Sequence, residues 1–245
     1  MTCASNIYLI FYQKHDMTQA SNTIEVYLEQ GSRRTFAGAL EWPGWCRSGR
    51  DEKAALQALI DSGPRYARVL HAAHMAFRAP IDVAELTVVE RLPGTTTTDF
   101  GVPEVAPTRD MEPFEQAELE RSEKLLQACW QAFDRAVQAA KGKQLRSGPR
   151  GGGRDLDKIM EHVLRAEQGY LHRLAWKLPR DEVTDMNEDF ARTRQAVLDA
   201  LAAAARGEMP ERGPRGGAIW KPHYFVRRVA WHVLDHVWEI EDRVM

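Results

Sequence analysis

The hydrophobic positions divide the chain into two parts with different periods. Between residues 24 and 50 apolar and polar side chains roughly alternate, which is the period of a strand with one buried face. From residue 112 onward apolar side chains recur at intervals of three and four, which is the period of an amphipathic helix. The change of period predicts an α+β N-terminal domain followed by an all-α four-helix bundle.

The N-terminal part predicts the element order β-β-β-α-β, a sheet with a helix on one face. Its strand segments are IEVYLEQ (24–30), RTFAGALEW (34–42), WCRSG (45–49) and LTVVERL (86–92). Asp51 is suited to cap a helix through EKAALQALI, because its side chain can accept a hydrogen bond from the first helical turn. The sequence Ser-Gly-Pro at 62–64 is expected to end this helix, and Pro64 suits the first position of a second one.

The C-terminal part predicts the four helices of the bundle, over residues 112–141, 155–178, 183–207 and 218–244. Segments that contain proline or glycine separate these helices. Residues 93–110 contain a run of threonines and several prolines without a helical period, which predicts a linker. The expected domains are therefore 23–92 and 111–245.

Composition narrows the possible partners and the compartment. The net charge of −2 argues against nucleic acid as a partner. The 3 cysteines form neither a disulfide framework nor a paired-cysteine metal site, so a cytoplasmic protein is expected. The apolar run IYLIFY at 7–12 is too short to span a membrane and lacks the flanks of a signal peptide. Residues 1–22 fit neither part, so we expect either a poorly ordered tail or a start codon placed upstream of Met17.

Candidate chemistry is concentrated in histidines of two predicted helices. His232 and His236 stand one turn apart on the last helix, about 100° from the centre of its apolar stripe. Open sites for zinc, nickel or iron usually have three protein ligands, and the second predicted helix offers His162, about 130° from its own stripe. Taken alone, such a pair is more often two surface histidines, and we expect this of His71 and His74.

Glu167 falls in the middle of the apolar stripe of the second predicted helix. A carboxylate in that position must be paired, bound to a metal or next to a cavity, so Glu167 is a candidate catalytic acid or base. Tyr170, Trp231 and Trp238 could line an apolar pocket beside the histidines, although packing is the commoner role of such side chains.

The segment HVLRAEQGY supplies His162, Glu167 and Tyr170, and RRVAWHVLDHVWEIEDR supplies His232 and His236. With these segments, residues 111–245 resemble the DinB-like superfamily of four-helix bundles. This superfamily places a histidine on the second helix, often followed by a glutamate and an aromatic residue, and an HxxxH pair on the last helix. The resemblance implies that His162, His232 and His236 are metal ligands. The superfamily includes transferases that use the thiols bacillithiol or mycothiol.

The segment TFAGALEWPGWCRSGRDEKAALQALI is similar to the sheet of HicB-like antitoxins, and the similarity covers about residues 23–92. In that fold a strand, a Pro-Gly turn, a short strand and a helix rich in alanine and leucine follow one another. Antitoxins usually add a DNA-binding tail, and the sequence contains no ribbon-helix-helix or helix-turn-helix candidate. The similarity therefore implies a fold and not toxin neutralisation.

Two functions from different classes follow from these observations. The first is a metal-dependent thiol S-transferase or hydrolase, with zinc, nickel or iron as the divalent metal, a low-molecular-weight thiol as a possible cofactor and a small electrophilic substrate. The second is a non-catalytic binding or regulatory protein, in which the HicB-like domain recognises a partner and the bundle dimerises. A homodimer is expected because the tryptophan-rich helix faces suit a subunit interface.

Overall fold

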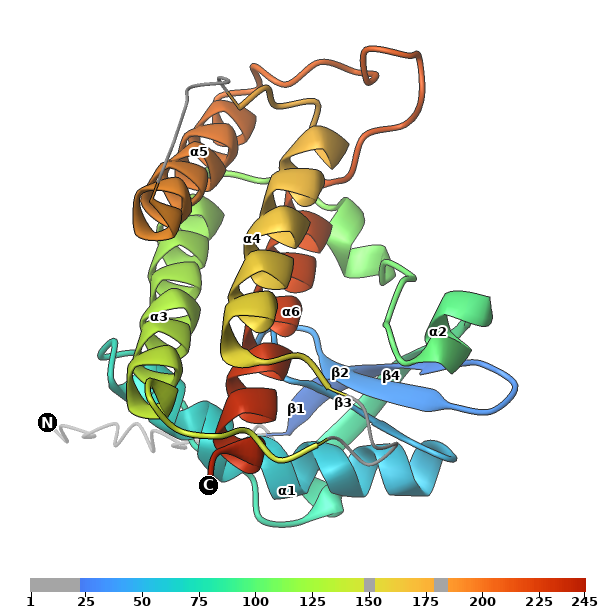
Figure 1. The fold of residues 1–245 in the computed structure, drawn as a ribbon. Helices are drawn as coiled ribbons and strands as arrows, with labels where there is room; N and C mark the ends of the chain where they lie inside the picture. Colours follow the sequence, from blue (N-terminus) through green and yellow to red (C-terminus); the bar gives the residue numbers. More distant parts are fainter. Residues whose placement is uncertain (1–22, 148–152, 179–184) are drawn as a thin grey trace, which may run out of the picture.

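The computed structural model describes residues 23–147, 153–178 and 185–245, so the expectation for residues 1–22 lies outside the described chain. A small sheet with one helix comes first, and four long helices follow (Figure 1), which confirms the predicted fold class. The strands are β1 (Ile24–Gln30), β2 (Thr35–Ala39), β3 (Cys46–Gly49) and β4 (Leu86–Pro93). The α-helices are α1 (Glu52–His71), α2 (Thr96–Phe100), α3 (Gln116–Ala140), α4 (Leu156–Arg173), α5 (Met186–Ala205) and α6 (Pro222–Arg243).

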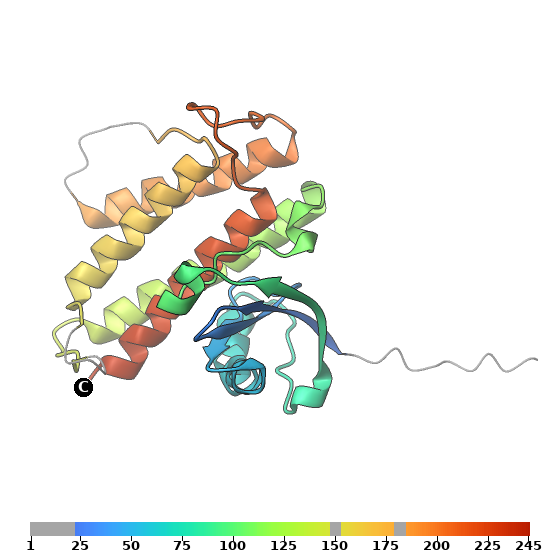
Figure 2. The same ribbon diagram turned by 90° about the vertical axis from the view of Figure 1, so that its right-hand side faces the viewer.

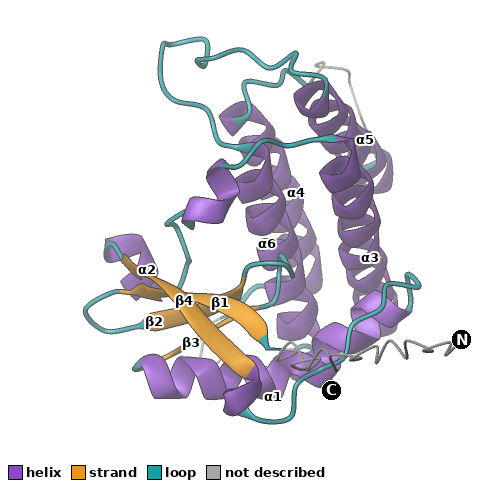
Figure 3. Cartoon of the chain, turned by 180° about the vertical axis from the view of Figure 1, so that it is seen from behind, coloured by secondary structure: helices purple, strands orange, loops and turns teal. Residues whose placement is uncertain are grey.

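The sheet has the strand order β3-β2-β1-β4, in which β1, β2 and β3 pair antiparallel and β4 pairs parallel to β1. Short turns join the antiparallel strands, whereas the parallel strand is reached only after α1 has crossed one face of the sheet (Figure 3). Val26 and Leu28 of β1 belong to the same buried core as Leu59 of α1. The first face of the sheet is therefore covered by the helix that the sequence predicted.

Helix α1 continues through residues 62–64, so the prediction that it ends there is wrong. Pro64 lacks the N–H that would normally continue the helical hydrogen bonding, but tertiary contacts support this turn. The indole of Trp45 donates a hydrogen bond to the carbonyl of Leu59 (3.0 Å), and the hydroxyl of Ser62 donates to the same oxygen (2.8 Å). Tyr66, in the next turn, is fully buried, so packing favours one continuous helix over two short ones.

The second face of the sheet is covered by α6, which the sequence did not predict. Figure 2 shows α6, in red, between α4 and the sheet. The ring of Phe36 in β2 meets the ring of Trp231 edge-on, with centroids 6.3 Å apart. Gly44, in the turn between β2 and β3, has a φ of 90°, and a Cβ added there would stand 3.0 Å from Ala230 of α6. The sheet and the bundle are therefore packed directly on each other.

A buried ion pair joins the two halves at this interface. Arg227 of α6 is 6% exposed and Asp110 is 1% exposed, and two guanidinium nitrogens donate to the carboxylate at 2.7 and 2.9 Å. The same guanidinium donates to the carbonyls of Ala39 (2.8 Å) and Leu40 (3.1 Å) at the end of β2. Buried charges are tolerated only when hydrogen bonds satisfy them in this way, so the geometry of the interface is specified.

The four long helices form a bundle in which α6 contacts α3 and α4, and α5 contacts the same two helices. The N–H of Trp220, just before α6, donates to the carbonyl of Arg173 at the end of α4 (2.8 Å), so α4 and α6 run in opposite directions. Each helix begins and ends within a few residues of its predicted bounds. None of the described helices is long and apolar enough to cross a membrane.

The predicted linker segment, residues 93–110, is folded along the sheet and includes the short helix α2, which the sequence did not predict. Its anchor is Glu29 of β1, whose side chain is fully buried. The carboxylate of Glu29 accepts hydrogen bonds from the hydroxyl of Thr98 and from the backbone N–H groups of Glu104 and Val105. The segment is therefore held in a fixed course between the sheet and α6.

Candidate metal centre

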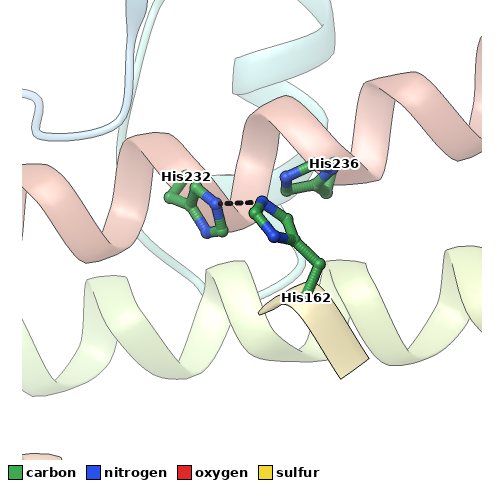
Figure 4. A group of neighbouring side chains, drawn as sticks. All are labelled: His162, His232 and His236. Atoms are coloured by element: carbon green, nitrogen blue, oxygen red, sulfur yellow. Dashed lines mark hydrogen bonds between the residues drawn. The ribbon is translucent and has the colours of Figure 1, made fainter. Parts of the chain in front are cut away.

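The three histidines that the sequence predicted as ligands come together between α4 and α6 (Figure 4). His162 extends from α4, and His232 and His236 extend from successive turns of α6. One ring nitrogen of each lies within 4.8 Å of the other two, and Nε2 of His162 is 3.2 Å from Nε2 of His232. His232 and His236 are each 7% exposed, whereas His162 is half-buried. The centre is thus closed on the α6 side and more open on the α4 side.

The position of His162 off the apolar stripe is explained by the two neighbours of α4. Ile159, Val163 and Glu167 lie on the buried stripe, while the flank that carries His162 faces α6. A helix that contacts two neighbours has an interior-facing flank beside its stripe, so an angle of about 130° on the helical wheel does not place a side chain in solvent. His232 and His236 are buried on the flank of α6 that faces α4, where the ring of His162 lies against both and the ring of Tyr170 lies against His232.

Burial makes two of the imidazoles hard to protonate. Desolvation and the nearby His236 lower the pKa of His162 to about 4. Desolvation, His236 and His162 lower the pKa of His232 well below its ordinary value. The charges of Arg154 and Arg228 act in the same direction on His232. At neutral pH both imidazoles are therefore uncharged, which is the form that ligates a metal ion.

Glu239 fixes the orientation of the third imidazole. Its carboxylate lies 2.8 Å from Nδ1 of His236, and the hydrogen bond from His236 lowers the pKa of Glu239. Because this carboxylate is ionised at neutral pH, Nδ1 of His236 must donate the hydrogen bond, and Nε2 keeps its lone pair. Arg243 pairs with the other oxygen of Glu239. A carboxylate behind a histidine is the arrangement that orients metal-ligating imidazoles in proteins.

The donor set fits a divalent transition metal. Ligands about 2.1 Å from a common ion lie roughly 3–4 Å apart, and small rotations of the imidazoles close the remaining distance. Nδ1 of His232 is buried and has no hydrogen-bond partner among the described residues, and its Nε2 faces another imidazole nitrogen. Nitrogen donors suit zinc, nickel or iron, whereas magnesium and calcium prefer oxygen ligands.

Glu167 has a different environment from the three histidines. The described ligand cluster contains His162, His232 and His236 and does not include Glu167. The Glu167 side chain is fully buried, and one carboxylate oxygen accepts a hydrogen bond from the indole of Trp130 in α3 (2.6 Å). Burial raises the pKa of Glu167 to about 7, although the charge of Arg194 opposes the shift. The catalytic role expected for this residue stays a prediction.

The aromatic residues named from the sequence have separate positions. Tyr170 lies beside the centre, with its ring centroid 5.8 Å from that of His232. Trp231 packs on Phe36 of the sheet, and Trp238 lies under the guanidinium of Arg47 at 3.6 Å. Both tryptophans therefore belong to the interface between sheet and bundle.

The sequence did not predict a role for Arg228, which lies near the centre. Arg228 lies one turn before His232 on α6 and is 8% exposed. A spacing of four residues from a ligand, on the same helix, was the available signal, because it places the guanidinium on the same side as the imidazole. The sequence alone does not show which of the two consecutive arginines, Arg227 or Arg228, faces the histidines, because the two side chains point to different surroundings.

The histidine pair His71 and His74 and the buried Cys46 do not belong to the described ligand cluster. His71 and His74 are exposed, as predicted. Cys46 is buried in the sheet, and burial followed by the charge of Glu29 raises the pKa of its thiol to about 12. A thiol with so high a pKa is a poor nucleophile at neutral pH.

Comparisons of the chain with family models, with curated proteins and with solved structures found no match.

Proposed function

We propose that residues 111–245 are a DinB-like bundle that holds one divalent metal ion on His162, His232 and His236. We propose further that the centre serves a thiol S-transferase or a hydrolase that acts on a small electrophilic molecule. The convergence of three imidazole nitrogens from two helices supports this function. The neutral state of His162 and His232 at neutral pH supports it as well.

In the proposed function each residue of the centre would have a distinct role. His162, His232 and His236 would hold zinc, nickel or iron, which when bound would supply a Lewis acid that lowers the pKa of a thiol or water. Glu239 would keep the proton of His236 on Nδ1 and so direct Nε2 toward the centre. The buried α6 side would exclude water, and the more open side at His162 would admit the thiol and the electrophile.

The non-catalytic alternative has less support from the structure. It depends on tryptophan-rich faces that would cover a second copy of the chain. Trp231 is 5% exposed and Trp238 is 3% exposed, and both are covered by contacts within one chain. These two side chains therefore give no specific reason to expect a dimer of the bundle.

The metal content of the purified full chain tests the proposal. We expect about one metal ion per chain, by elemental analysis, which a strong chelator removes. A His232→Ala/His236→Ala variant should hold none, while a His71→Ala/His74→Ala variant, which alters the exposed pair at and just after the end of α1, should hold as much as the wild type. A metal-replete chain without bound metal, or equal metal in both variants, would refute the ligand assignment.

Turnover then separates the two reaction types. Consumption of an electrophilic probe by the metal-loaded chain should require added thiol if the protein is a transferase, and should proceed with water alone if it is a hydrolase. Loss of turnover in the His232→Ala/His236→Ala variant, with unchanged far-ultraviolet circular dichroism, would tie either reaction to the centre.

A further inference from the structure

Arg228 is a buried cation for which the described part of the chain supplies no ion pair. It is 8% exposed, and among the described residues Arg227, at 6%, is the other buried arginine. The Nε of Arg228 has no hydrogen-bond partner among these residues. The charge of Arg228 lowers the pKa of Glu104, but the carboxylate of Glu104 accepts a hydrogen bond from the hydroxyl of Thr95. Burying a guanidinium without a counter-charge is costly, so the unpartnered Nε and the missing ion pair of Arg228 within the described chain require an explanation.

The contacts that Arg228 does make hold it in place without neutralising it. One terminal nitrogen donates to the carbonyl of Pro103, and the other lies 3.4 Å from the hydroxyl of Tyr170. The guanidinium also lies 5.1 Å from the centroid of the Trp231 ring and 5.6 Å from that of Tyr170. These interactions orient the fork of donors, and a cation held so is suited to bind a planar anion.

Arg228 lies close to the three histidines along the contact between α4 and α6. Arg228 precedes His232 by one turn of α6, and Tyr170 follows His162 by two turns on α4, which runs the opposite way. His162 and Tyr170 are both half-buried, so the seam between the two helices is partly accessible along this line. Side chains one helical turn apart have Cβ atoms about 5–6 Å apart, which is the span of a molecule with two or three carbons.

Charge around the centre favours a negative ligand. The three imidazoles bring no negative charge, and Arg154 and Arg228 both disfavour protonation of His232 through their own charges. Glu239 is the carboxylate in contact with the ligand set, and it is already engaged by His236 and Arg243. A divalent ion would add two positive charges to this environment, so a substrate that reaches it gains from an anionic group.

We infer that Arg228 is the anion-recognition residue of this centre, and that the ligand carries a carboxylate one helical turn from its reactive atom. The inference rests on the proposed function for the identity of that reactive atom. The carboxylate is received by the free donors of Arg228, with the hydroxyl of Tyr170 beside it. It belongs either to the thiol or to the electrophile, which share this chemistry.

Calorimetry on the cobalt-loaded full chain tests the inference with two pairs of probes. The thiol pair is 3-mercaptopropionate and 2-mercaptoethanol, and the pair without a thiol is acetate and acetamide. The carboxylate member of at least one pair should bind at least about tenfold tighter than its uncharged partner, as expected for a charged hydrogen bond. A preference in the thiol pair alone assigns the carboxylate to the thiol, and a preference in both pairs or in the acetate pair alone assigns it to the second substrate.

Variants decide whether Arg228 is responsible. Arg228→Gln should lose the preference while it keeps its cobalt, Arg228→Lys should keep part of it, and Tyr170→Phe should reduce it. Arg165→Gln removes an exposed arginine of α4 and should leave the preference unchanged. Equal binding within both pairs by the cobalt-loaded wild type, or a full preference in Arg228→Gln, would overturn the inference and leave the metal assignment standing.

A chain that holds no cobalt would refute the proposed function instead. In that case the metal-free chain decides the inference by itself. Acetate should bind to the wild type in preference to acetamide and should do so less to Arg228→Gln, and the absence of that difference would overturn the role of Arg228.

Discussion

Arg227 and Arg228 are consecutive residues of α6 and are almost equally buried, yet their surroundings differ. Arg227 faces the sheet, where one carboxylate and two carbonyls accept its hydrogen bonds. Arg228 faces the side of the three histidines, and among the described residues it has one carbonyl partner, a distant hydroxyl and no partner for its Nε. A complete set of partners is what a structural arginine needs, and an incomplete set beside a ligand cluster is what a binding residue needs. The two faces of α6 therefore differ in how completely they satisfy a buried arginine, and we infer that they serve different roles.

The largest expected effect is on stability, when the ion pair between Arg227 and Asp110 on the sheet side of α6 is removed. Arg227→Met leaves the carboxylate of Asp110 buried without a counter-charge, so the free energy of unfolding should fall by about 3–5 kcal/mol. Chemical denaturation measures the loss, and adding Asp110→Asn to this variant should recover part of it. Arg228→Met is the matched control, and its cost should be about 1 kcal/mol or less, since no buried carboxylate loses its partner. Equal losses in the two methionine variants would contradict the distinction.

The second prediction concerns the buried carboxylate of Glu167 and its effect on how the stability of the protein depends on pH. The pKa of Glu167 is about 7 in the folded chain, against an ordinary value of 4.5 that applies to the unfolded chain. Between pH 4.5 and pH 7 the folded state therefore binds more protons than the unfolded state. The free energy of unfolding should therefore fall as the pH rises from below 4.5 to above 7, by an order of about 3 kcal/mol for this group.

Glu167→Gln should remove that pH dependence and raise stability at pH 8, because a neutral amide can still accept the hydrogen bond from Trp130. Denaturation curves at several pH values provide the measurement, with the exposed Glu161→Gln as the control on the same helix. The prediction fails if the difference between Glu167→Gln and the wild type is the same at every pH.

The smallest expected effect concerns the support of the centre itself. Glu239→Ala removes the acceptor that orients His236, so metal affinity should fall roughly 10–100-fold while the ligands remain. Competition with a chelator of known affinity measures the change. Glu241→Ala removes an exposed acid of the same helix, which pairs with Arg65, and should leave the affinity unaltered. Similar affinities of these two variants would remove Glu239 from the description of the centre.

Local pattern was sufficient to predict the strands, the four long helices and the histidine pair of α6, whereas the choice of His162 as a third ligand came from the resemblance to DinB-like bundles. Period, proline and glycine act within a few residues, and the spacing of His232 and His236 is a property of one helix. The course of α1 through Pro64 was mispredicted because the hydrogen bond that supports it comes from Trp45, outside the helix. Local propensity is a weak guide where such tertiary contacts compete with it.

The covering of the sheet by α6 could not be predicted, because no local period reports which distant segment covers a face. The same limit applies to Glu167, whose position on the apolar stripe was evident while its partner, Trp130, lies on another helix. It applies also to Arg228, because the inference about this residue depends on finding no ion pair for it in the described part of the chain. Contacts of this kind depend on the arrangement of helices, and a single sequence gives only the faces that each helix offers.

The double use of α6 has a consequence for how the protein is made. A chain leaves the ribosome from its N-terminus, and the sheet with α1 is complete long before α6 is translated. Until then Tyr27, Phe36 and Cys46, which α6 covers in the finished fold, have nothing on them from that helix. The nascent sheet thus has an uncovered apolar face during the synthesis of α3, α4 and α5, and we expect the chain to be most prone to aggregation in this interval.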